Sequence, residues 1–125
     1  MQTRLRDSSY AEVRRFKTLG SKERVSISDT KDTLWFIIEV DGEPAGCCGL
    51  YLTKAKARMK GDYVLPQYRG LGLGTLSSDF RIEKARELGY SLIETLTVNP
   101  DYYGKKGFTL NGKVREGVWN MTKEI

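Results

Sequence analysis

The chain has 125 residues, which is enough for one domain with a single core but not for two. Its 39% hydrophobic and 30% charged residues are typical of a globular protein, and no run approaches the ~20 apolar residues that a membrane helix needs. The net charge of +5 favours polyanionic ligands without choosing between a phosphate-bearing cofactor and a nucleic acid, and the lack of histidine excludes Ser-His and Cys-His nucleophile systems.

The first half of the chain predicts strands on either side of a short helix and a long loop. Ser9 and Glu12 have the spacing of a capping box, which predicts a helix of about two turns with Val13 and Phe16 facing inward. The apolar run that follows the loop predicts a strand covered on both faces, and Asp-Gly at 41–42 predicts a hairpin turn. In chain order we expect an edge strand, the helix, the loop and the two hairpin strands at 3–6, 9–16, 18–31, 33–40 and 45–52.

Cys47 and Cys48 are the only cysteines and are adjacent in the second hairpin strand. A disulfide between neighbours is strained, and two thiols in a chain without histidine cannot build an ordinary zinc site. We therefore expect two small core residues on opposite faces of one strand, and no metal.

The second half predicts a strand, a glycine-rich loop, a helix and three further strands. In the first of these strands the expected inward set is Ala55, Ala57, Met59, Gly61 and Tyr63, and the outward set is Lys56, Arg58, Lys60 and Asp62. We expect the helix over 74–88, capped by Gly89, and strands over 91–98, around 111–112 and over 118–122. Strands around a loop and helix crossover, with an antiparallel end, make an α/β fold with a mixed sheet.

The stretch 64–74 joins the alternating strand to the helix and carries three glycines at alternate positions. Pro66 lacks an amide N–H and has a fixed φ, so it ends the strand just before Gly70, Gly72 and Gly74. Alternate glycines let successive amide N–H groups point into one concavity, and the helix start adds unpaired amides and a positive dipole end. This predicts an anion-binding loop whose spacing fits neither the Rossmann fingerprint nor the Walker A loop. The alternative is a plain glycine turn between a strand and a helix.

The late strand 91–98 carries a single carboxylate in an apolar row. Leu92, Glu94, Leu96 and Val98 share one face of this strand. Desolvation raises the pKa of a carboxyl group, and a raised pKa suits a general base that works near neutral pH. Glu94 is therefore a candidate base, and the alternative is an ordinary surface glutamate at a sheet edge.

Two segments together resemble the signatures of the GNAT superfamily of acyl-CoA-dependent N-acyltransferases. The first is Gln67-x-x-Gly70-x-Gly72, and in the second Asn99 is followed by Tyr103, which stands four residues before Gly107-Phe108. The resemblance covers 60–108 and the hairpin at 34–52 agrees with it. It implies a GNAT-like α/β fold, with a mixed, mostly antiparallel sheet of about six to seven strands flanked by helices, in one domain over 1–125.

The resemblance also implies roles for individual residues. Tyr103 would be the general acid that protonates the leaving thiolate of coenzyme A, and Glu94 stands where some members keep their base. Val64 and Asn99 would bind the pantetheine arm, and Thr75 would lie near the pyrophosphate. The loop amides that hold the pyrophosphate would come from Arg69, Gly70, Leu71, Gly72, Leu73 and Gly74. This chain departs from the family in a short N-terminal part, where the family usually has two helices that frame the acceptor site, and in a very short helix between Asn99 and Tyr103.

The resemblance thus implies an N-acetyltransferase that transfers an acetyl group from acetyl-CoA to a primary amine by direct attack in a ternary complex, and the sequence favours a cytoplasmic location. The acceptor would be a small molecule or a protein, no membrane is involved, and the late strands offer edges for a homodimer. One alternative is an acyl-CoA-binding module without turnover. The other is a nucleic-acid-associated domain that uses the basic residues of 22–24 and 56–60, with Trp35 or Tyr68 as stacking surfaces.

Overall fold

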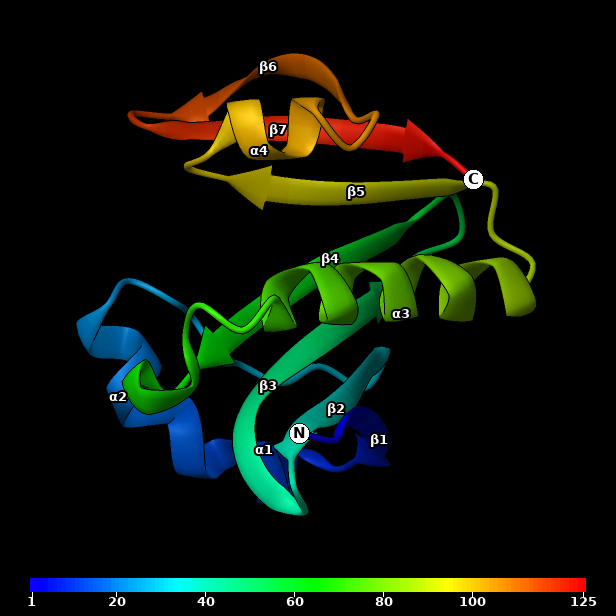
Figure 1. Cartoon of the computed structure of the whole chain (residues 1–125). Helices are drawn as coiled ribbons and strands as arrows, with labels where there is room; N and C mark the ends of the chain where they lie inside the picture. The colour runs from blue at the N-terminus through cyan, green and yellow to red at the C-terminus, as the bar shows by residue number, and fades with distance from the viewer.

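The computed structural model describes all residues from Met1 to Ile125. One seven-stranded sheet has the order β1-β2-β3-β4-β5-β7-β6 (Figure 1). Its strands are β1 (Thr3–Ser8), β2 (Thr33–Val40), β3 (Glu43–Leu52), β4 (Ala57–Val64), β5 (Leu92–Thr97), β6 (Thr109–Arg115) and β7 (Val118–Glu124). Only β4 and β5 run parallel, and every other neighbouring pair is antiparallel. The predicted α/β fold with a mixed, mostly antiparallel sheet is confirmed.

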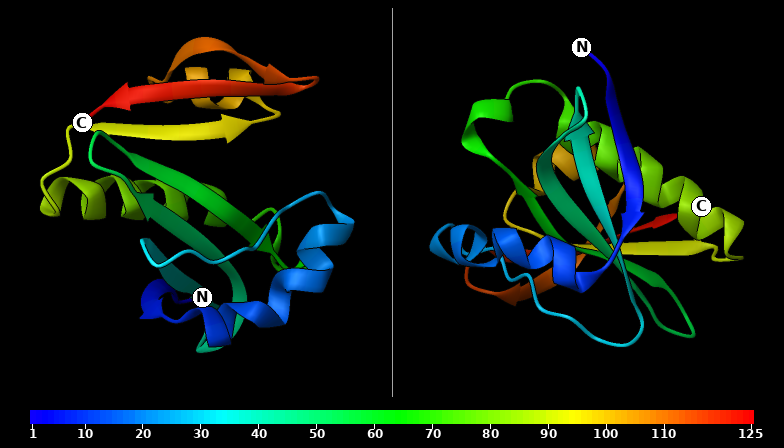
Figure 2. Two further views of the ribbon diagram at one scale, coloured as in Figure 1. Left: turned by 180° about the vertical axis from the view of Figure 1, so that it is seen from behind. Right: turned by 90° about the horizontal axis from the view of Figure 1, so that it is seen from below.

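Helices cover both faces of the sheet, but not along its whole width. They are α1 (Tyr10–Val13), the 3-10 turn η1 (Arg14–Phe16), α2 (Lys17–Lys22), the 3-10 turn η2 (Pro66–Tyr68), α3 (Leu73–Glu87) and α4 (Pro100–Gly104). One core cluster joins α3 to the sheet through Phe36, Met59 and Ile82. A second cluster packs Val13 and Phe16 against the opposite face of β2 to β4. Seen from behind, no helix covers β5 and β7 (Figure 2), and none of the helices is long and apolar enough to cross a membrane.

The N-terminal helix begins where predicted, but the prediction of a capping box between Ser9 and Glu12 is wrong. The side chain of Ser9 makes no capping hydrogen bond. Glu12 instead accepts hydrogen bonds from Arg6 and, at 2.6 Å, from the Ser8 hydroxyl, because the guanidinium of β1 offers a charged partner. Val13 and Phe16 are buried as predicted.

The loop predicted over 18–31 is wrong for its first part, because the chain stays helical to Lys22. Gly20 is the buried residue of α2, and a Cβ there would lie 3.1 Å from Ile27. The buried face of α2 is thus made by a glycine, which leaves no hydrophobic periodicity for the sequence to reveal.

The β2–β3 hairpin confirms the sequence prediction. Asp41 and Gly42 have φ values of 49° and 83°, which is the left-handed backbone that tight hairpin turns require. Cys47 and Cys48 are both buried, carry free thiols and belong to the clusters on opposite faces of the sheet. Burial raises the pKa of both thiols, that of Cys48 to about 12, so both stay protonated.

The alternation predicted for β4 is wrong for Ala55, which is exposed in the turn before the strand, holds from Ala57 to Lys60 and fails beyond it. Cys47 pairs with Tyr63 but Gly49 pairs with Lys60, so β4 has one extra residue at a β-bulge. Gly61 lies in this bulge with φ 64°, and a Cβ there would lie 2.7 Å from the Trp35 ring. The bulge reverses the faces, so Tyr63 packs with Val13 and Phe16 instead of with Met59. Asp62 consequently faces α3.

The remaining elements lie close to their predicted positions. The helix expected over 74–88 is α3, and the three late strands are β5, β6 and β7. β6 is an edge strand and is exposed along its whole length.

Candidate active site

The candidate site lies where β4 and β5 separate. The two strands pair through only three residue pairs, the last of which is Met59 with Thr95, and then diverge toward their C-terminal ends (Figure 1). The bulge at Gly61 bends β4 away from β5 at this point. The resulting cleft has a volume of about 470 Å³ and is lined by Asp62, Val64, Tyr68, Arg69, Gly70, Gly72, Leu73, Gly74, Thr75, Asn99, Tyr102 and Tyr103.

The glycine-rich loop forms the end of the cleft at the start of α3. Gly70 and Gly72 have φ values of 80° and 78°, and a Cβ on either would meet no atom within 4 Å. No backbone hydrogen bond uses the amide N–H groups of residues 70–75. The first turn of α3 contains no acidic residue, so its positive dipole end is uncompensated. Unpaired amides, a helix start and free space suit the diphosphate of coenzyme A.

Residues around the loop hold it in this conformation. The Arg69 Nε donates to the Val64 carbonyl at 2.9 Å, and its Nη2 pairs with Glu23 of the segment after α2 at 2.8 Å. Leu73 is buried and anchors the start of α3. Leu71 is 42% exposed and does not line the cleft, so only its amide remains available to a ligand.

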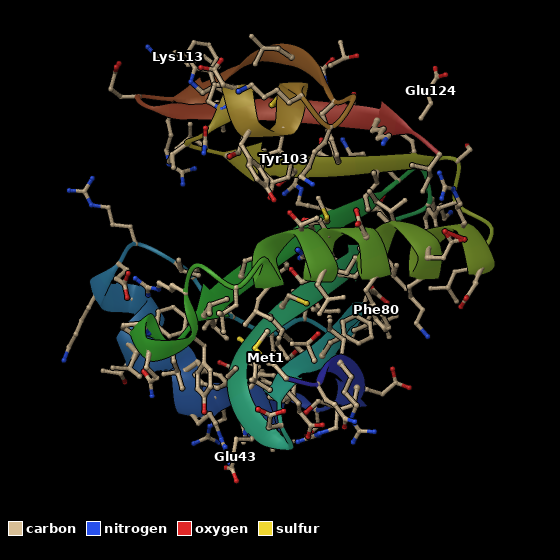
Figure 3. The ribbon with its side chains drawn as sticks, in the orientation of Figure 1. Met1, Glu43, Phe80, Tyr103, Lys113 and Glu124 are labelled. Carbon is tan, nitrogen blue, oxygen red and sulfur yellow. The ribbon has the colours of Figure 1, made fainter.

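Two adjacent tyrosines of α4 enter the cleft from the β5 side. Tyr102 forms a hydrogen bond with the Thr75 hydroxyl at 3.0 Å, which ties α4 to α3. Tyr103 packs edge-on against Phe108 and is directed toward β5 and α3 (Figure 3). Burial raises the pKa of the Tyr103 phenol above its ordinary value, and the negative charge of Asp62 adds to this. The phenol is therefore protonated at neutral pH and can act as a proton donor.

Asn99 lies at the edge of the cleft and caps α4. Its side-chain oxygen accepts a hydrogen bond from the amide of Tyr102 at 3.4 Å. The helix between Asn99 and Tyr103 is as short as the sequence predicts, because Pro100 starts it and it ends at Gly104. This places Asn99 and Tyr103 in the same cleft wall.

Glu94 does not have the environment that the sequence predicted. It is 2% exposed, does not line the cleft and accepts hydrogen bonds from Lys56 at 2.7 Å and Arg58 at 2.5 Å. Asn120 adds a third at 2.7 Å. Burial alone would raise the Glu94 pKa, but these hydrogen bonds outweigh it and the pKa is lowered. The predicted raised pKa is wrong, and a carboxylate with two cationic partners is a poor general base.

An ion pair between a buried arginine and a half-exposed aspartate lies beneath the cleft, and the sequence did not predict it. Arg81 of α3 is fully buried and donates to both carboxylate oxygens of Asp62, at 2.7 and 2.6 Å. Asp62 is the one carboxylate among the residues that line the cleft, and its side chain is 44% exposed. The buried serines Ser77 and Ser78 leave room for the arginine on α3. This pair of small residues was the one pattern in the sequence that could have indicated a buried Arg81.

The ammonium group of Lys60 in β4 makes its contacts within the protein. Lys60 donates to the Ser28 carbonyl at 2.7 Å and lies over the rings of Trp35 and Tyr51. Trp35 itself is 3% exposed, so it cannot be the stacking surface that the nucleic-acid alternative offered.

The mixed sheet splits beside an anion-binding type of loop and a half-buried phenol, which is the arrangement that the resemblance to the acyltransferases implies. The chain belongs to the acetyltransferase (GNAT) family, whose model matches residues 3–108. A search of curated protein sequences found no match.

Solved structures share this fold at low sequence identity. N-acetylglutamate synthase from Neisseria gonorrhoeae, complexed with coenzyme A and N-acetyl-glutamate, has a TM-score of 0.79 at 15% identity over 99% of this chain. This chain spans only 35% of the synthase. A GNAT family acetyltransferase from Elizabethkingia anophelis with acetyl-CoA bound has a TM-score of 0.73 at 15% identity, over 98% of both chains. An IAA acetyltransferase from Bacillus cereus has a TM-score of 0.78 at 14% identity, over 99% of this chain and 100% of the other.

Proposed function

We propose that this protein is an N-acetyltransferase that transfers an acetyl group from acetyl-CoA to a primary amine by direct attack in a ternary complex. The observation that carries the proposal is the single cleft that joins the unpaired loop amides to the protonated Tyr103 phenol. Membership of the GNAT family supports the acyl donor.

Each part of the cleft would bind one part of acetyl-CoA. The amides of 70–75 would hold the pyrophosphate, with the Thr75 hydroxyl beside them. Beyond Met59 the β5 side of β4 has no partner strand, which leaves the edge near Val64 for the pantetheine arm. Asn99 would bind the same arm from the opposite wall.

The transfer needs a neutral amine, a polarised thioester carbonyl and a proton for the leaving sulfur. The amine nitrogen forms a bond to the carbonyl carbon, and the carbon–sulfur bond then breaks. Tyr103 donates its proton to the thiolate, so that coenzyme A leaves as a neutral thiol. The amine would lose its proton to water in the cleft, because Asp62, the carboxylate that lines the cleft, is paired through both of its oxygens with Arg81.

The experiment that tests this proposal is Tyr103→Phe, with Tyr102→Phe as the matched control. We expect Tyr103→Phe to lower kcat by about 10²-fold, because general acid catalysis typically contributes 10²- to 10⁴-fold, and to retain residual activity, because the cleft still holds both reactants. Tyr102→Phe removes only the hydrogen bond to Thr75 and should mainly affect KM for acetyl-CoA. Coenzyme A release measured with a panel of amines gives both constants. An unchanged kcat in Tyr103→Phe, or binding of acetyl-CoA without any turnover, would contradict the proposal.

A further inference from the structure

Glu94, Lys56 and Arg58 form a charged cluster that the proposed chemistry does not use. The cluster lies on the face of β4 and β5 opposite α3, because neighbouring Met59 and Ile93 pack into the α3 core. On this side no helix covers β5 and β7 (Figure 2). Asn111 of β6 extends the polar surface by donating to Asn120 at 2.9 Å. The surface is polar and open to solvent.

Within the cluster, Arg58 uses only one of its three guanidinium nitrogens in a hydrogen bond to the protein. Its Nε donates to Glu94, while its two terminal amino groups donate to no protein atom. The side chain is 36% exposed, so these amino groups reach solvent. Glu94 therefore orients a guanidinium whose remaining donors form a planar fork, the geometry that binds a carboxylate.

The position of Arg58 places this fork beside the reaction centre. Met59 is the last residue of β4 that pairs with β5, so Arg58 lies two residues, or about 7 Å, before the split at Lys60. In the proposed function, the loop amides and Tyr103 would bind acetyl-CoA from the α3 side. An acceptor amine would then reach the thioester through the split from the opposite face, past Arg58.

The charges at this position favour a single negative charge. Lys56 and Arg58 together carry one more charge than Glu94 neutralises. Lys60, the next cation along β4, is occupied by Ser28 and two aromatic rings. A monoanionic carboxylate matches this local excess.

We propose that Arg58, oriented by Glu94, binds a carboxylate of the acceptor, so that the acceptor is an amine that also carries an acidic group. This inference rests on the proposed acetyltransferase function. It makes Arg58 a specificity residue and Glu94 a positioning residue.

The test compares amines that differ only in their charge. A series of ω-amino acids from glycine to 6-aminohexanoate is measured against the corresponding carboxamides. For the best chain length we expect kcat/KM for the acid to exceed that for the amide by at least about tenfold, which corresponds to about 1.4 kcal/mol and lies near the lower end for a hydrogen bond to a charged group. The preference should lie in KM, because the carboxylate is bound equally before and during transfer. In Arg58→Gln the acid-to-amide ratio should fall to near one, and in Arg58→Lys to an intermediate value. Arg15→Gln removes an exposed positive charge elsewhere and should keep the wild-type ratio.

A second measurement keeps the test independent of turnover and of folding. The same acids and amides are titrated into the free protein and into its complex with coenzyme A, so that affinity is read without catalysis. Because Arg58→Gln removes one of the two cations that pair with the buried carboxylate of Glu94, the variant could lose stability. The double variant Arg58→Gln/Glu94→Gln, which also removes the carboxylate charge, is therefore measured beside it. Equal affinity for acid and amide in the wild type would overturn the inference and leave the acetyltransferase proposal standing. Failure of acetyl-CoA to bind would overturn the proposed function, and the titration of the free protein would still report on Arg58.

Discussion

At the scale of single residues, the charge of Glu94 stabilises the junction of β4, β5 and β7. Its pKa in the folded state lies below the unfolded value of about 4.3. The stabilisation is therefore fully present above that value and is lost as the pH falls through the lower folded pKa. We expect Glu94→Gln to lower the free energy of unfolding by about 1–3 kcal/mol at pH 7, and the difference from wild type to shrink below about pH 4.

Urea unfolding at pH 7 and at pH 3.5 measures this difference. Glu83→Gln is the matched control, because Glu83 forms an exposed pair with Arg86 and should contribute less than about 1 kcal/mol. If Glu94→Gln were as stable as wild type at pH 7 but lost kcat, Glu94 would be a base after all.

The sequence could predict that Glu94 lies on a strand, but not that its pKa is lowered. Alternation along β5 predicts its face, and the structure confirms that it is buried. Its partners Arg58 of β4 and Lys56 just before that strand lie more than 30 residues earlier, across the one parallel pairing of the sheet. No local pattern reveals that register, and for a buried carboxylate the partners determine the direction of the pKa shift.

At the scale of elements, the bulge in β4 aims Asp62 into the cleft. We expect Gly61→Ala to destabilise the protein by at least about 2 kcal/mol, because it forces a side chain into left-handed backbone and against the Trp35 ring. Gly112→Ala in β6 is the control, since a Cβ there meets no atom within 4 Å, and it should change stability by less than about 0.5 kcal/mol. Thermal unfolding followed by circular dichroism measures both. Equal melting temperatures would mean that the bulge relaxes at little cost.

The elements themselves show which signals in a sequence are reliable. The hairpin of β2 and β3 follows from two apolar runs and an Asp-Gly turn, all of which are local. The alternation of charged residues with small or apolar residues continues through Gly61. The sequence therefore predicts β4 as one regular strand and gives no sign of the bulge. The helix α2 is missed for the opposite reason, because Gly20 provides its buried contact without a hydrophobic side chain.

At the scale of the whole molecule, the two faces of one sheet carry different polar groups at the same split. The α3 face holds the loop amides, Tyr103 and Asp62, and the opposite face of the same split presents Arg58 and Glu94. The sequence could predict the loop, because Gly70 to Thr75 are contiguous. It could not predict that Asp62, Asn99 and Tyr103 meet there, because this depends on how far β4 and β5 diverge.

The measurement that tests the account most directly is calorimetric titration with acetyl-CoA, with coenzyme A and dephospho-coenzyme A beside it. The wild type should bind acetyl-CoA in the micromolar range. Gly72→Asp should lose this binding, because it adds a negative charge among the amides at the start of α3. Gly72→Asn is the matched control, since asparagine has the same shape without the charge and tolerates the left-handed backbone at φ 78°, so it should retain most of the affinity. If the wild type did not bind acetyl-CoA, or if Gly72→Asp bound it equally well, the loop from Gly70 to Gly74 would be only a turn between β4 and α3.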